Sequence, residues 1–143
     1  MRPLPLERLA LLLLSTVAVI ATIHATATAT GWYYTHPWID IPLHILGGIF
    51  IGTLFVYLFF VRFRVLGTLS FFPKLILGLG FVALIGIGWE WYEIFVDVVI
   101  LNHYTLFHAP GYLHFDTLKD LFDDLVGGTI AIFALQNVSR ENR

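Results

Sequence analysis

Six ionisable side chains in this sequence recur in three pairs at the spacing of one helix turn. The pairs are Asp40 and His44, Glu90 and Glu93, and Asp120 and Asp124. Residues three or four apart lie on the same face of a helix, so each pair would present its side chains together. Carboxylates with imidazole and no thiolate suit Zn, Mn or Mg better than copper(I). A cation held this way can activate water for hydrolysis. Carboxylates that share protons would instead suit ion-coupled transport.

The residues around these pairs are apolar, which places the pairs inside membrane helices. Of the 143 residues, 58% are hydrophobic and 13% are charged, whereas an ordinary soluble domain has about 45–50% and about 25%. Four apolar runs have about the length that crosses a bilayer: residues 9–29, 41–61, 75–101 and 117–135. The sequence therefore predicts an all-α fold, a four-helix transmembrane bundle that forms one domain over residues 1–143.

The first run has an alternative interpretation. Arg2 and Arg8 precede it, and Ala25-Thr26-Ala27 near its end is typical of a signal-peptide cleavage site. Because the run is longer than a usual signal core, we expect a retained transmembrane helix.

Basic residues predict the orientation of the helices. Seven of the eight lie before the first run, between the second and third, or after the fourth: Arg2, Arg8, Arg62, Arg64, Lys74, Arg140 and Arg143. Loops rich in Lys and Arg stay in the cytoplasm, so we expect a cell (inner) membrane protein with both termini cytoplasmic. The inner side then has seven basic and two acidic side chains (+5), and the outer side one and eight (−7).

The three pairs would meet near the outer boundary of the membrane, within about 10 Å of it at 1.5 Å per residue. We predict that a divalent cation, Zn, Mn or Mg, is bound there by His44, Glu90, Glu93, Asp120 and Asp124. Glu93 and Asp124 are also the predicted catalytic residues. Asp40, Asp97 and Asp116 are secondary candidates.

Several of these polar residues also have an ordinary structural interpretation. Asp40 and Asp116 stand at predicted helix starts, where a carboxylate caps free N–H groups. Asp97 and Asp123 would reach interfacial water. Lys119 would either neutralise an acidic neighbour or attract an anionic group. The remaining histidines lie near loops or helix ends and are expected to be solvated: His24, His36, His103, His108 and His114.

Three functions are compatible with this pattern. The first is a metal-dependent hydrolase that acts on a lipid or lipid-linked envelope substrate. The second is a small ion- or proton-coupled transporter subunit, and the third is an accessory protein with a structural polar core. Membrane lipids are the expected partners, and the net charge of −2 gives no reason to expect nucleic acid. Small-residue stripes such as Gly48-xxx-Gly52 would pack helices closely or join protomers into a homo-oligomer.

The order of the motifs resembles VanZ-like small membrane proteins and the related YjdF-type family. The resemblance rests on Asp40-xxx-His44, Glu90-xx-Glu93 and Thr117-xx-Asp120-xxx-Asp124-xx-Gly127, and it covers residues 38–135. VanZ-like proteins are associated with teicoplanin resistance, and the resemblance implies a membrane protein with an outward polar site. The family pattern has Gln at the position of Glu93, Asn at that of Asp124 and Lys at that of Ile41. These departures make the site more acidic, which favours cation binding over the teicoplanin link.

Overall fold

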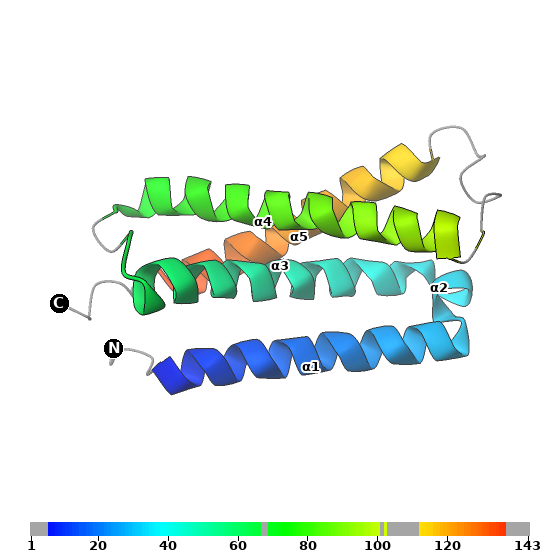
Figure 1. Cartoon of the computed structure of the whole chain (residues 1–143), viewed down its shortest axis with the longest axis horizontal. Helices are drawn as coiled ribbons and strands as arrows, with labels where there is room; N and C mark the ends of the chain where they lie inside the picture. Colours follow the sequence, from blue (N-terminus) through cyan, green and yellow to red (C-terminus); the bar gives the residue numbers. More distant parts are fainter. Residues whose placement is uncertain (1–5, 67–68, 101, 103–111, 137–143) are drawn as a thin grey trace.

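Four long helices form the structure, a computed structural model that describes residues 6–66, 69–100, 102 and 112–136. They are α1 (Leu6–Thr30), α3 (Asp40–Val56), α4 (Phe71–Phe95) and α5 (Tyr112–Ala134) (Figure 1). The short helix α2 (Trp32–Thr35) and the 3-10 turn η1 (Pro37–Ile39) join α1 to α3. The π-helical turns η2 (Tyr57–Arg62) and η3 (Val96–Ile100) continue α3 and α4. Within these residues the fold is all-helical, as predicted.

Three helical segments are long and apolar enough to cross a bilayer: Glu7–Thr30, Pro37–Arg62 and Phe71–Ile100. The helix α5 has 23 residues but is not among them, because Asp and Lys side chains interrupt its first half. The structure thus supports a helical membrane protein with three candidate spans and a fourth helix. The count of four spans and the orientation of the termini stay predictions.

Some predictions concern residues outside the described ranges. The charges that orient the termini include Arg2, Arg140 and Arg143, which lie there. So do His103 and His108, and nothing is described of the His114 side chain.

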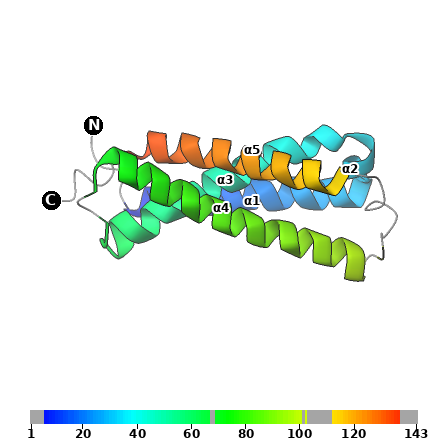
Figure 2. The ribbon, with the colours of Figure 1, turned by 90° about the horizontal axis from the view of Figure 1, so that it is seen from above.

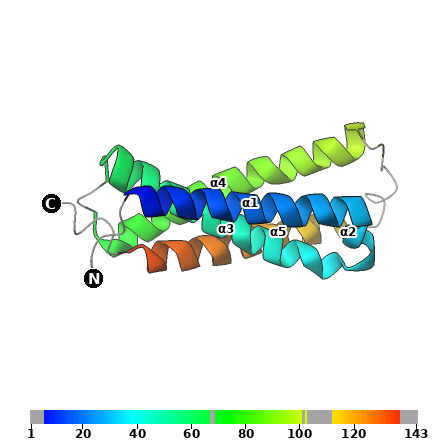
Figure 3. The ribbon, with the colours of Figure 1, turned by 90° about the horizontal axis from the view of Figure 1, so that it is seen from below.

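The helix α3 lies between α1 on one side and the pair α4 and α5 on the other (Figures 1 and 3). Its most extensive packing is against α5, and α4 packs against both α3 and α5. Figure 1 shows α5 crossing behind α4, and in the view of Figure 2 the two helices diverge toward the end of the bundle where α5 begins. In contrast, α1 packs mainly against α3 and makes no comparable contact with α4. The start of α1 and the end of α5 lie at the same end of the bundle (Figure 1).

Glycines allow α3 and α5 to approach each other closely. A Cβ atom at Gly48 would collide with the backbone carbonyl of Asp124, and one at Gly127 would collide with the carbonyl of Ile45. Gly52 lies in the same interface. The predicted Gly48-xxx-Gly52 stripe therefore packs two helices of one chain together.

The two ends of the bundle differ in chemistry. Buried apolar side chains fill the end where α1 begins and α5 ends: Leu9, Phe55, Val56, Phe60, Val61 and Leu135. At this end Lys74 is 1% exposed. Its Nζ donates a hydrogen bond of 3.3 Å to the carbonyl of Leu135 and lies 4.4 Å from the centre of the Phe60 ring. The carboxylates of α3, α4 and α5 lie toward the opposite end.

The substitution Gly48→Ala tests the close crossing of α3 and α5. The added methyl group has no room against Asp124, so the helices must separate, and we expect a loss of about 1–3 kcal/mol in the free energy of unfolding. Unfolding in detergent measures this change. Gly80→Ala is the matched control, because a Cβ atom there meets nothing within 4 Å and alanine favours a helix by about 1 kcal/mol. Equal stability of the two variants would contradict the packing described.

Candidate functional site

The polar residues predicted from the sequence meet at one end of the bundle. Asp40 and His44 come from the start of α3, and Glu90 and Glu93 from the last turns of α4. The other contributions come from the first half of α5. We name the following eight residues the polar cluster: Asp40, His44, Glu90, Glu93, Lys119, Asp120, Asp123 and Asp124. Five of them are buried, with 8% exposure or less.

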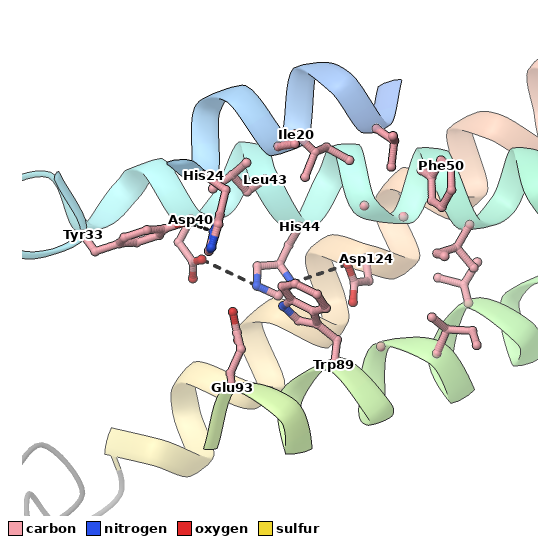
Figure 4. A pocket seen from close by; sticks show the side chains of 18 residues that line it. Ile20, His24, Tyr33, Asp40, Leu43, His44, Phe50, Trp89, Glu93 and Asp124 are labelled. Atoms are coloured by element: carbon pink, nitrogen blue, oxygen red, sulfur yellow. Dashed lines mark hydrogen bonds and ion pairs between the residues drawn. The ribbon is translucent and has the colours of Figure 1, made fainter. Parts of the chain in front are cut away.

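His44 lies at the centre of the polar cluster. Its Nε2 is 3.6 Å from Oδ1 of Asp40 and 3.8 Å from Oδ1 of Asp120. Its Nδ1 is 3.4 Å from Oδ1 of Asp124. Glu93 of α4 points toward the same imidazole (Figure 4). One buried side chain therefore faces carboxylates from α3, α4 and α5.

Glycines of two helices make room for the carboxylate of Asp124. A Cβ atom at Gly86 of α4 would lie 2.6 Å from Oδ2 of Asp124, and one at Gly47 of α3 would lie 3.5 Å from Oδ1. The small residues predicted as packing stripes thus also admit a charged group beside His44.

Lys119 supplies a positive charge to one side of the polar cluster. Its Nζ is in direct contact with Oδ1 of Asp120 and lies 3.4 Å from Oδ2 of Asp40. Oδ2 of Asp123 is 3.8 Å away. Of the two roles that the sequence left open for Lys119, the structure shows the neutralising one.

The predicted capping role of Asp40 is wrong. The N-cap residue of α3 is Ile39, and no side chain makes a capping hydrogen bond there. The carboxylate of Asp40 instead faces His44 and Lys119, because a contact with the Lys119 ammonium group is stronger than one with exposed backbone N–H groups.

Two predictions about α5 are also wrong. The helix begins at Tyr112, four residues before Asp116, so Asp116-Thr117 does not open it. Asp123 was expected to reach interfacial water but is 8% exposed. Its carboxylate lies one turn after Lys119 and faces that ammonium group, which explains its inward position.

Two groups within the polar cluster have the dimensions of a metal site. They are Asp40, His44 and Asp120, and His44, Glu90 and Glu93; in each, the ligand atoms lie within 4.8 Å of one another. Ligands that bind one zinc ion at about 2.1 Å are at most about 4.2 Å apart. Side-chain adjustments of less than about 1 Å would therefore gather either group around one ion.

The two groups differ in how well they suit a cation. In the first, Lys119 already supplies positive charge to Asp40 and Asp120. In the second, Glu90 is 5% exposed, and its Oε1 has no hydrogen-bond partner among the described residues. A buried carboxylate oxygen without a partner is costly, and a bound cation would satisfy it. The second group therefore fits a metal better.

The remaining predicted ligands occupy other positions. Asp124 belongs to neither group and faces Nδ1 of His44. Asp97 lies in η3 and Asp116 in α5, and neither belongs to a group of metal-site dimensions among the described residues.

A pocket of about 410 Å³ opens beside His44, between α1, α3 and α4 (Figure 4). Its polar lining consists of His24, Tyr33, Asp40, His44, Glu93 and Asp124, and the rest is apolar side chains and glycines. Neither this pocket nor the position of His24 and Tyr33 at it was predicted from the sequence. The signal in the sequence was Gly31, which follows the last residue of α1. Its φ is 70°, a conformation that glycine adopts without strain and that commonly ends a helix. The chain turns there, and Tyr33 lies within hydrogen-bonding distance of His24.

Tyr33 and His24 form a polar pair at the edge of the pocket. The hydroxyl of Tyr33 and Nδ1 of His24 are hydrogen-bonded at 2.7 Å. Burial, together with the negative charges of Asp40 and Glu93, raises the pKa of Tyr33 to about 12. Tyr33 therefore remains a neutral hydroxyl at physiological pH and is available for hydrogen bonding.

A family model matches residues 1–141 of the chain, and its description is "Predicted membrane protein (DUF2238)". The chain belongs to this family. No curated protein and no solved structure matches it. Membership in DUF2238 confirms the prediction of a small membrane protein, without singling out the VanZ-like or YjdF-type resemblance.

The pairing of Lys119 with Asp120 in this DUF2238 member can be tested by a double-mutant cycle. Lys119→Met leaves buried carboxylates without their ammonium partner, so we expect it to lower the free energy of unfolding by about 3 kcal/mol. The loss should shrink in the Asp120→Asn background by a coupling energy of about 0.5–3 kcal/mol.

Unfolding of the four proteins in one detergent measures the coupling. Lys119→Arg, which retains the charge, serves as the control and should keep most of the stability. Strictly additive effects of the two substitutions would contradict the ion pair.

Proposed function

We propose that this chain is a four-span protein of the cell membrane that binds a divalent cation near the outer face. The observation that carries the proposal is the group formed by His44, Glu90 and Glu93, in which a buried oxygen of Glu90 lacks a partner among the described residues. Zn, Mn and Mg are the cations that suit two carboxylates and an imidazole. The resemblance to VanZ-like and YjdF-type proteins supports the membrane location and the outward polar site.

The surface of α5 supports its assignment as the fourth span. Its Lys119, Asp120 and Asp124 face Asp40 or His44 of α3. Among the described residues of α5, the large exposed side chains are apolar: Phe115, Leu118, Phe122, Ile130 and Phe133. An average of hydropathy over all residues of α5 includes the charged side chains that face α3. The average is therefore lower than the hydropathy of the surface that α5 exposes. The outward orientation of the polar cluster rests on the distribution of basic residues in the sequence.

His44 is arranged as a metal-binding histidine would be. Histidines that bind a metal with one ring nitrogen usually donate the other N–H group to a carboxylate, which orients the ring. Asp124 faces Nδ1 at 3.4 Å, so Nε2 is the nitrogen that we assign to the cation. In this proposal Asp124 positions His44, and Glu90 and Glu93 supply the charge that binds the metal.

Hydrolysis is the chemistry that we propose for this site. A divalent cation bound there supplies Lewis acidity and lowers the pKa of water. Glu93 and Asp124 line the pocket and are the residues that we assign to proton transfer. Water would be split across an ester bond of a lipid or lipid-linked envelope substrate, the hydroxyl going to the acyl or phosphoryl group and the proton to the leaving oxygen.

The structure gives less support to the transporter hypothesis. The polar cluster lies toward one end of the bundle, and buried apolar side chains such as Leu9, Phe55 and Phe60 fill the other. A site that serves one side of the membrane fits this division. A homo-oligomer stays an expectation, and the faces available for it include Gly80 and Gly88 of α4, where a Cβ atom would meet nothing within 4 Å.

Metal analysis of the purified protein tests the cation site. We expect about one Zn, Mn or Mg ion per chain in the wild type and at least about a tenfold loss of affinity in Glu90→Gln. The same ion should raise the melting temperature of the wild type, because a ligand present at 100 times its Kd stabilises the folded state by about 2.7 kcal/mol.

Asp97→Asn is the matched control for this experiment, since Asp97 is an acidic residue of the same helical segment outside the metal-sized groups. It should bind metal as the wild type does. A purely structural polar core predicts a different result, namely no stoichiometric metal in the wild type and no melting response to any of the three ions.

The hydrolytic step is tested by mass spectrometry of membrane lipids from cells that produce the protein. Cells with the wild type should accumulate a cleaved lipid species that is absent from cells with Glu93→Gln, since removing a general base lowers a rate by about 100- to 10,000-fold. Cells with Asp97→Asn should resemble those with the wild type. Identical lipid profiles in all three strains would argue against hydrolysis while leaving cation binding unaffected.

A further inference from the structure

The pocket beside His44 extends along α3 to about the depth of one membrane leaflet. It is lined by α3 residues from Asp40 to Ile51, a distance of about 16 Å at 1.5 Å per residue. The hydrocarbon core of a bilayer is about 30 Å thick. The pocket therefore spans about half of that core, starting from the polar cluster.

The pocket is open on the side between α1 and α4. Three of its lining side chains are also exposed on the surface of the bundle: Val17 is 43% exposed, Ile85 41% and Trp89 44%. Both helices pack against α3 but make no extensive contact with each other. For a helix pair that crosses a bilayer, this opening faces lipid, so a membrane component could enter sideways.

The lining changes from polar to apolar along the length of the pocket. At one end are the ionisable groups of Asp40, His44 and Glu93, and at the other is Phe50 (Figure 4). The apolar residues Ile51 and Val82 also line the pocket. A molecule that fills the whole pocket must combine a polar head with an apolar chain. Its volume of about 410 Å³ lies within the range of about 300–1,000 Å³ found for ligand pockets.

We infer that this pocket binds one hydrocarbon chain of a phospholipid, with the head group beside the polar cluster and the chain along α3. The chain site depends only on the apolar lining. The head-group assignment rests on the proposed cation, because carboxylates repel a bare phosphate and a divalent cation between them would attract it. The inference thus names phospholipids as the substrate class of the proposed site.

Native mass spectrometry of the full chain in detergent, after incubation with phosphatidylglycerol, tests the inference. We expect one lipid to be retained by the wild type. Ala21→Phe places a ring in the pocket from α1 and should lower the retained fraction at least about tenfold, the equivalent of 1.4 kcal/mol. Ala18→Phe is the matched control, because Ala18 is exposed on the same helix and does not line the pocket.

A second pair of variants repeats the test from α4 in case Ala21→Phe does not fold. Ile85→Trp should block the pocket, whereas Leu84→Trp should not, since Leu84 is 67% exposed and does not line it. Equal lipid retention in a blocking variant and its control would overturn the inference, as would no retained lipid in the wild type. A wild-type dimer that Ala21→Phe dissociates would also overturn it, because a second copy of the chain would then cover the opening.

EDTA separates this inference from the proposed function. Without divalent cations the wild type should still retain a lipid chain but should lose its preference for phosphatidylglycerol over phosphatidylcholine. A second outcome is that the protein binds no metal and retains lipid equally with and without divalent cations. That outcome would refute the proposed function and the head-group assignment, but it would leave the site for the hydrocarbon chain intact. Loss of all lipid in EDTA would contradict the inference that the hydrocarbon chain is bound by the apolar lining without help from a cation.

Discussion

The close crossing of α3 and α5 is the constraint on which the rest of the structure depends. Because Gly48 and Gly127 lack side chains, the backbone of each helix contacts that of the other. This contact brings Asp124 beside His44, and Gly86 lets α4 approach the same carboxylate. A Cβ atom at Gly48 or Gly127 would collide with a backbone carbonyl oxygen of the facing helix, so a larger side chain at either position would force α3 and α5 apart and weaken the contact between Asp124 and His44.

The polar cluster at this helix crossing has two parts with different charge. Lys119 lies within 4 Å of carboxylate oxygens of Asp40, Asp120 and Asp123, so this part carries its own positive charge. The other part contains the buried carboxylate of Glu90, whose Oε1 has no hydrogen-bond partner among the described residues, and burying charge without a partner is unfavourable in an apolar surrounding. That asymmetry is the physical reason for placing a cation at Glu90 and Glu93 and not at Asp40 and Asp120.

The features that depend on local periodicity could be predicted from the sequence, and those that depend on helix contacts could not. The spacing of Glu90 and Glu93 on one helix face, and the position of His44 in an apolar run, indicated a polar site at one depth. The capping role assigned to Asp40 was wrong, because a free carboxylate at a helix start and one paired with a distant lysine look alike in sequence. The inward position of Asp123 likewise follows from its pairing with Lys119, which no local pattern of apolar residues specifies.

The distribution of charge on α5 has a consequence for the biogenesis of the protein. An isolated α5 would expose its acidic face to lipid, at a cost of about 2.5–3.5 kcal/mol for each charge near the centre of a helix. That cost is avoided when His44 and the glycines of α3 and α4 are already in place. In the proposed four-span arrangement, stable insertion of α5 would then require α3 and α4 to have assembled first. The polar cluster would be completed in the same step in which the last span enters the membrane.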